Sequence, residues 1–163
     1  EVGNMWLELL NKIKYAIESS DFGGRVELGF LNPMNAGVDE QGLILLGRGE
    51  TLPIDGKVQA MLKQEFYLET WVRSDTDDFA VAYEAICKLE SEIESILIDF
   101  RNKCGELNED ICILPDSGYQ IVDIRCTNKT ADNGSVRPCI GTQYRFEARM
   151  YDLKQSNSNG GIY

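Results

Sequence analysis

Apolar residues recur at helical spacing in two segments of the chain. The first segment runs from about Asn4 to Ser20, and the second follows the acidic stretch Ser74–Asp78 and reaches about Lys103. Serine, threonine and aspartate suit a helix N-terminus because their oxygens accept hydrogen bonds from free backbone N–H groups. We therefore predict two amphipathic helices, each covered on its apolar side. The predicted apolar stripe of the second helix consists of Phe79, Ala82, Tyr83, Ile86, Leu89, Ile93, Ile96, Leu97 and Phe100.

Short apolar or alternating runs predict five strands in the rest of the chain. They are expected at Arg25–Leu31, at Leu43–Gly47, from Val58 or Lys63 to Ser74, at Tyr119–Cys126 and at Thr142–Tyr151. In the fourth strand, Ile121 is predicted to face one side of the sheet and Val122 and Ile124 the other.

Two turn signals separate the predicted strands, Asp55-Gly56 and Asp132-Asn133-Gly134. The second signal lies in the link Thr127–Gly141, and loops of that length in a compact domain are usually functional or disordered.

The order of elements is helix, three strands, helix, two strands (α-β-β-β-α-β-β). Alternating strands are typical of an antiparallel or mixed sheet with one covered face. Two helices on that face would bury every apolar stripe, which predicts an α+β fold with a mostly antiparallel sheet. Residues 1–154 are expected to form this single domain. Residues 155–163 are polar and contain glycine, so we expect a flexible C-terminal tail.

The third strand has two different faces. Its core face consists of Phe66, Leu68, Thr70 and Val72, and its other face of Tyr67, Glu69, Trp71 and Arg73. The second set is either a solvent-exposed face with scattered aromatic residues or part of a subunit interface, where Tyr, Trp and Arg are enriched.

The chain is acidic, because 27 Asp and Glu residues against 16 Lys and Arg residues give a net charge of −11. This argues against general nucleic-acid binding, which needs cations that displace counterions from phosphates. The charge fits either ordinary solubility or a surface along which DNA slides without binding. No apolar run approaches the about 20 residues that span a bilayer, so no membrane contact is expected.

The sequence indicates no catalytic residue, no cofactor-binding residue and no metal ligand. It lacks histidine, which excludes Ser-His and Cys-His nucleophiles and most zinc sites. Its five cysteines include no Cys-x-x-Cys pair, which favours a reducing compartment, and Cys87 and Cys126 are expected to be small core residues. Gly47-Arg48-Gly49 lacks the remainder of a nucleotide-binding loop, and the aspartates of Ser74–Asp78 fit helix capping better than calcium binding. We therefore expect a protein that is not an enzyme.

Part of the chain resembles a known protein family. The resembling residues are Leu52-Pro53, the strand Gln64–Ser74 and the helix Ala82–Leu89. They are similar to the tail terminator, or tail completion, proteins of long-tailed bacteriophages, prophages and phage-tail-like particles, which are grouped with minor capsid proteins. The opening helix, the short strand after it and the closing strand pair also resemble the layout of that family.

The resemblance implies a structural virion protein that forms a homo-oligomer, a hexameric ring. The ring caps the finished tail tube, stops its polymerisation and provides the joining surface for the head or neck. The implied partners are the tail tube protein, a sheath protein where there is one, and a head or neck connector protein. DNA passes through the ring without specific binding. The implied location is the tail or neck of a virion assembled in the cytoplasm of a bacterial host.

A ring needs heterologous contacts that close on rotation. Edge strands, the Thr127–Gly141 link and the second face of the third strand are natural sites for such contacts. The residues expected at the subunit interface are Tyr67, Trp71, Arg73, Arg48 and Asn133. The alternative function is a monomeric or dimeric α+β adaptor that binds another neck or capsid-connector protein.

Overall fold

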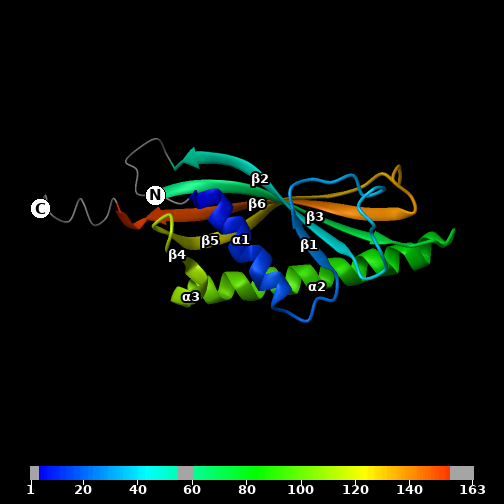
Figure 1. Ribbon diagram of the computed structural model, residues 1–163, viewed down its shortest axis with the longest axis horizontal. Helices are drawn as coiled ribbons and strands as arrows, with labels where there is room; N and C mark the ends of the chain where they lie inside the picture. The colour runs from blue at the N-terminus through cyan, green and yellow to red at the C-terminus, as the bar shows by residue number, and fades with distance from the viewer. Residues whose placement is uncertain (1–3, 55–60, 155–163) are drawn as a thin grey trace, which may run out of the picture.

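The protein consists of one sheet with its helices packed on one face (Figure 1). The computed structural model describes residues 4–54 and 61–154. The elements are α1 (Met5–Glu18), β1 (Arg25–Leu28), β2 (Leu43–Pro53), β3 (Met61–Arg73), α2 (Phe79–Gly105), α3 (Glu109–Cys112), β4 (Ile113–Leu114), β5 (Tyr119–Ala131) and β6 (Cys139–Asp152). The predicted α+β class is thus confirmed.

The strands lie in the order β1-β2-β3-β6-β5-β4. β1 and β2 are parallel, and every other neighbouring pair is antiparallel. β3 and β6 form the centre and pair along their whole lengths, from Met61 opposite Tyr151 to Arg73 opposite Cys139. β1 and β4 are short, and each covers only one end of its neighbour. Among the described residues, most of the outer backbone of β2 and β5 therefore has no strand beside it.

The main core lies between the sheet and the helices. α1 lies over β1 and β2, and α2 runs along β3, β6 and β5 for nearly the whole length of the sheet (Figure 1). Phe66 of β3 stacks on Phe146 of β6 with ring centroids 5.1 Å apart. Ile13 of α1 and Ile93 of α2 are fully buried in the same cluster. Each such side chain contributes about 1.5–3 kcal/mol, so this cluster holds the two layers together.

A smaller apolar cluster lies on the opposite side of the sheet, which we call the open face. Segment 29–42, between β1 and β2, folds across this face. The cluster consists of Val38, Leu43, Leu45, Trp71 and Cys139. All four residues of the run Leu43–Leu46 are fully buried because the two clusters cover β2 on both faces. Burial on both faces explains why this run is apolar throughout and does not alternate.

Several strands are longer than the sequence pattern predicts. β2 continues to Pro53, and most of the predicted Thr127–Gly141 loop is strand, with only residues 132–138 between β5 and β6. The added β5 residues are all exposed, so they lack the apolar alternation that marks a strand. α3 and β4 were not predicted. The predicted turn at Asp55-Gly56 and the predicted tail at 155–163 lie outside the described residues.

A bulge in β5 changes which of its side chains reach the core. The register with β6 shifts between Ile121 and Asp123, which leaves Val122 as an extra residue. Ile121 and Ile124 are consequently both buried against the helices, and Val122 is exposed. The predicted placement of Ile121 and Ile124 on opposite faces is therefore wrong.

Four residues that the sequence predicts in the core are exposed, namely Phe79, Tyr83, Cys87 and Cys126. Phe79 packs on Tyr83, with centroids 5.7 Å apart, at the start of α2. Tyr83 and Cys87 each come directly after a buried residue of α2. Because successive side chains of a helix are about 100° apart around its axis, both point away from the buried stripe. Cys126 lies on the part of β5 beyond its pairing with β4, and no other strand of the described part of the chain lies beside it there.

Candidate assembly surface

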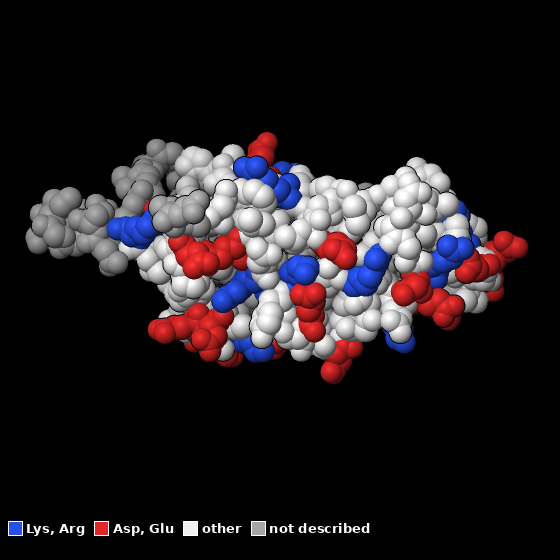
Figure 2. Space-filling model, in the orientation of Figure 1, with Lys and Arg blue, Asp and Glu red and all other residues white. Residues whose placement is uncertain are grey.

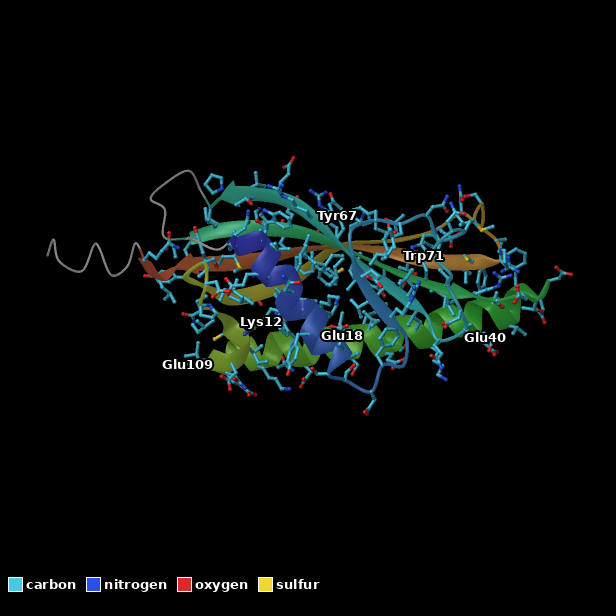
Figure 3. The ribbon with its side chains drawn as sticks, in the orientation of Figure 1. Lys12, Glu18, Glu40, Tyr67, Trp71 and Glu109 are labelled. Carbon is cyan, nitrogen blue, oxygen red and sulfur yellow. The ribbon has the colours of Figure 1, made fainter. Side chains whose placement is uncertain are left out.

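Tyr67 and Trp71 lie on the same face of β3, as predicted, with Trp71 nearer the end that leads to α2 (Figure 3). That face is the open face. Tyr67 is partly exposed, and the ring of Phe30 meets it edge-on with centroids 6.2 Å apart. Phe30 belongs to segment 29–42, and more than half of its surface is exposed. Phe30 and Tyr67 therefore both leave aromatic surface available to a partner on this face.

Trp71 is a core residue, and only 9% of its surface is exposed. Its Nε1–H donates a hydrogen bond to Glu69 Oε1 over 3.0 Å. Its ring lies so close to β6 that a Cβ on Gly141 would come within 2.4 Å of it. The expectation that Trp71 is solvent-exposed is corrected, because Val38 of segment 29–42 packs with it in the smaller cluster.

The other residues predicted at the interface lie apart from one another. Arg73 ends β3 on the open face and is exposed. Arg48 lies on the helix side of β2, with its guanidinium 4.3 Å from the ring centre of Trp6. Asn133 lies in the turn between β5 and β6, where its Oδ1 accepts a hydrogen bond from the Ser135 backbone N–H. The five predicted residues therefore do not form one surface.

Several charged side chains of the open face are paired with one another. Glu65 is buried and accepts two hydrogen bonds of 3.0 Å from Arg145 Nη2. The bond to Glu65 raises the pKa of Arg145. Lys63 Nζ lies 3.5 Å from Glu147 Oε1. On the side of the molecule shown in Figure 2, acidic and basic side chains are likewise interspersed. In these pairs each positive charge lies beside a negative one, unlike the continuous basic surface that binds nucleic acid.

A groove of about 200 Å³ lies between α2 and the outer part of β5. It is lined by Glu94, Leu97, Ile98, Arg101, Ile124, Cys126, Lys129, Tyr144 and Phe146. Its lining is mainly apolar, and 58% of the surface of Ile98 is exposed. A cavity of about 150 Å³ accepts benzene, so the groove has room for one ring or a comparable aliphatic side chain.

A polar network joins α2 to β5 and β6 at the groove. The Tyr144 hydroxyl donates to Glu94 Oε2 over 2.7 Å, and Lys129 Nζ donates to the same oxygen over 2.9 Å. Burial raises the pKa of Tyr144, and the bond to Glu94 raises it further. Burial also acts to raise the pKa of Glu94, but the hydrogen bonds from Lys129 and Tyr144 outweigh it and lower that pKa. At neutral pH the phenol is neutral and the carboxylate charged, which suits a structural network and not proton transfer.

The free edges of β2 and β5 lie at the same level of the sheet. Thr51 of β2 pairs with Gln64, Gln64 pairs with Ala148, and Ala148 pairs with Ile124 of β5. These four residues form one row across the sheet, with Thr51 at one edge and Ile124 at the other. Three antiparallel pairings separate β2 from β5, so the two edge strands run in opposite directions.

Sequence reasoning missed the two residues that expose the most apolar surface beside the β5 edge, Ile98 and Val122. Ile98 follows Leu97 and lies off the buried stripe of α2, a signal that the sequence does contain. Val122 became exposed because of the bulge, for which the sequence gives no sign. Cys126 is expected in the core because it ends a predicted strand, where a cysteine usually has a small apolar role, but the exposed outer part of β5 gives it no such cover.

Among the described residues, no three Cys, Asp or Glu side chains converge in a way that could hold a metal ion. None of the described helices is both long enough and apolar enough to cross a bilayer. A scan against protein-family models finds no match to the chain, and neither does a search of curated proteins.

Proposed function

We propose that this protein is a structural virion component of a phage, a prophage or a phage-tail-like particle. Its copies form a closed ring, hexameric in the family that it resembles, which caps the tail tube and joins it to the head or neck. Its partners are the tube protein, a sheath protein where there is one, and a connector protein. The α+β fold and the resembling segments Gln64–Ser74 and Ala82–Leu89 support this function.

The observation that carries the proposal is the pair of free edges at one level of the sheet. Rotation about an axis parallel to the strands keeps the direction of each strand along that axis. Such a rotation brings β2 of one copy beside β5 of the next without a shift along the axis, and the two strands are then antiparallel. One heterologous contact can thus repeat and close, as a cyclic ring requires.

Features on both edges limit pairing between free copies. Each edge strand contains a bulge, β2 ends at Pro53, and the β5 edge carries Arg125 and Lys129. Natural sheets use bulges, proline and charges to prevent indiscriminate edge-to-edge pairing. The ring is therefore expected to form on the tail tube more readily than in dilute solution.

The charge of the chain is compatible with the passage of DNA. With a net charge of −11, each copy repels the phosphate backbone. A ring of such copies lets DNA pass without specific binding, because it lacks the excess of cations that retains DNA.

Size-exclusion chromatography with light scattering, followed by electron microscopy, tests the proposed function. The chain is measured alone over a range of concentrations and again with the tail tube protein encoded beside it. We expect rings, on the tube ends if not in free solution. A chain that stays monomeric at high concentration and in the presence of tube protein would contradict the proposal. Binding as a monomer or dimer to a connector protein, without binding to tube, would support the adaptor function instead.

A further inference from the structure

We propose that the free β5 edge and the groove beneath α2 receive the free β2 edge of a second copy of this chain. This inference rests on the proposed ring and identifies its subunit contact. The occupant is the segment from Gly47 to Pro53, the part of β2 that lies beyond its pairing with β1.

Within residues 4–54 and 61–154, no strand pairs with the outer side of β5 beyond β4. β4 lies there only opposite Tyr119 and Gln120. Beyond these residues α2 continues along the sheet, and two apolar side chains flank the outer side of β5. Ile98 of α2 is 58% exposed and Val122 of β5 is 43% exposed. An added strand would cover both, and its backbone would satisfy the unpaired groups of β5, as in recognition by strand addition.

The rows of the sheet specify the register of the added strand. A pure rotation places Thr51 of one copy opposite Ile124 of the next, because both belong to the same row. Gln64 lies on the same side of β3 as the core residue Phe66, because side chains two residues apart share a face. Thr51 pairs with Gln64 and lies on that side too, so in the added strand its side chain faces the groove. In this register Pro53 lies opposite Val122.

Charge complementarity favours a second copy as the occupant. Gly49 and Glu50 form the β2 bulge opposite Glu65, and Glu65 shares a row with Glu147 and Arg125. The register that places Thr51 opposite Ile124 therefore places Glu50 opposite Arg125. Opposite charges across a strand pair stabilise it, and like charges destabilise it. Arg125 pairs within its own copy with Asp123, which also binds Arg101, so Asp123 keeps a partner if Arg125 turns to Glu50.

A charge-swap experiment tests this contact. Glu50→Arg and Arg125→Glu each bring like charges together, and we expect each to weaken ring assembly at least about tenfold. The double variant restores the opposite pair and should recover most of the lost assembly. Both residues are exposed, so thermal unfolding of the isolated chain should change little in any variant. Recovery in the double variant would exclude a general effect of altered net charge, because each single variant changes that charge in the opposite direction.

The native cysteines provide a second and independent test. Cys126 lines the groove, and Cys87 is exposed on α2, 11 residues before Ile98 and hence about 16 Å along the helix. On ring assembly, alkylation of Cys126 by N-ethylmaleimide should slow at least about tenfold relative to Cys87, with both followed by peptide mass spectrometry. Burial raises the pKa of Cys126 even in the free chain, so each cysteine is compared with itself before and after assembly.

The outcomes separate this contact from the proposed function. Rings in which Cys126 remains as reactive as in the free chain, and in which neither charge variant weakens assembly, would overturn the β2–β5 contact and leave the ring in place. Absence of rings with tube protein present would overturn both. Protection of Cys126 by a connector protein in the absence of rings would show that a different partner occupies the groove and would also overturn the contact.

Discussion

At the scale of single residues, Trp71 shows how the surroundings of a side chain decide its role. Its sequence context, between Glu69 and Arg73 on the alternate face of a strand, suggests an exposed or interfacial residue. The cover over it comes from segment 29–42, whose path the sequence pattern does not reveal. We predict that Trp71→Ala lowers the free energy of unfolding by about 3–5 kcal/mol because it leaves a cavity under that segment. Urea unfolding followed by circular dichroism measures this change.

Tyr67→Ala is the matched control for the Trp71 substitution. Tyr67 lies on the same face of the same strand but is partly exposed, so its loss should cost less than half as much. Equal effects of the two substitutions would mean that segment 29–42 does not cover Trp71 in solution.

The stability of the fold depends on the protonation state of Glu94. Although burial acts to raise its pKa, the bonds from Lys129 and Tyr144 leave the pKa below the ordinary 4.5. A lowered folded-state pKa contributes stability above the unfolded-state pKa, and this contribution is lost as the pH falls through the folded-state value. Since 42% of the side chain is exposed, solvent screening limits the contribution to about 1 kcal/mol or less.

Because the folded-state pKa of Glu94 is lowered, the effect of replacing Glu94 should depend on pH. Glu94→Gln should be less stable than the parent chain at pH 7, and the difference should shrink towards about pH 3 as the parent carboxylate becomes protonated. Urea midpoints at several pH values measure the difference. A difference that grows on acidification would contradict the assigned network.

At the scale of elements, periodicity predicted the two long helices and the central strands but not the edges. β3 and β6 have one core face along their whole lengths, so their alternation was visible in the sequence. The end of β5 is exposed on both faces, and the bulge at Val122 interrupts the alternation of side chains between the two faces of the strand. Hydrogen bonding to β6 defines this part of the strand, and such pairing leaves no apolar pattern in the sequence.

The exposed side of α2 provides a prediction at the same scale. Ile98→Glu should leave thermal stability nearly unchanged, because Ile98 is largely exposed, but it should weaken ring assembly at least about tenfold by placing a charge at the groove. Val81→Glu is the matched control, since Val81 is 49% exposed on the same helix and does not line the groove. Sedimentation or light scattering of both variants with tube protein measures assembly. Equal loss in both would point to a general charge effect.

At the scale of the whole molecule, the sequence predicted the α+β class but not the geometry of a candidate site. The predicted interface residues were selected by type, as exposed aromatic, Arg and Asn residues. The free edges depend instead on the shortness of β1 and β4 and on pairings between residues as distant as Gln64 and Ala148. Such long-range register is a property of the folded sheet, and no local pattern in one sequence encodes it.

The net charge of the whole chain leads to a last prediction. Copies with a net charge of −11 repel one another over distances far greater than the proposed Glu50–Arg125 contact. The screening length falls from about 30 Å at 0.01 M salt to about 8 Å at 0.15 M salt. Repulsion between whole copies should therefore weaken more than attraction within the contact, and ring assembly should strengthen over this range. Light scattering at constant protein concentration measures the trend, and the charge-swapped double variant should follow it because its net charge is the same. Weaker assembly at higher salt would instead mean that local ion pairs dominate the association.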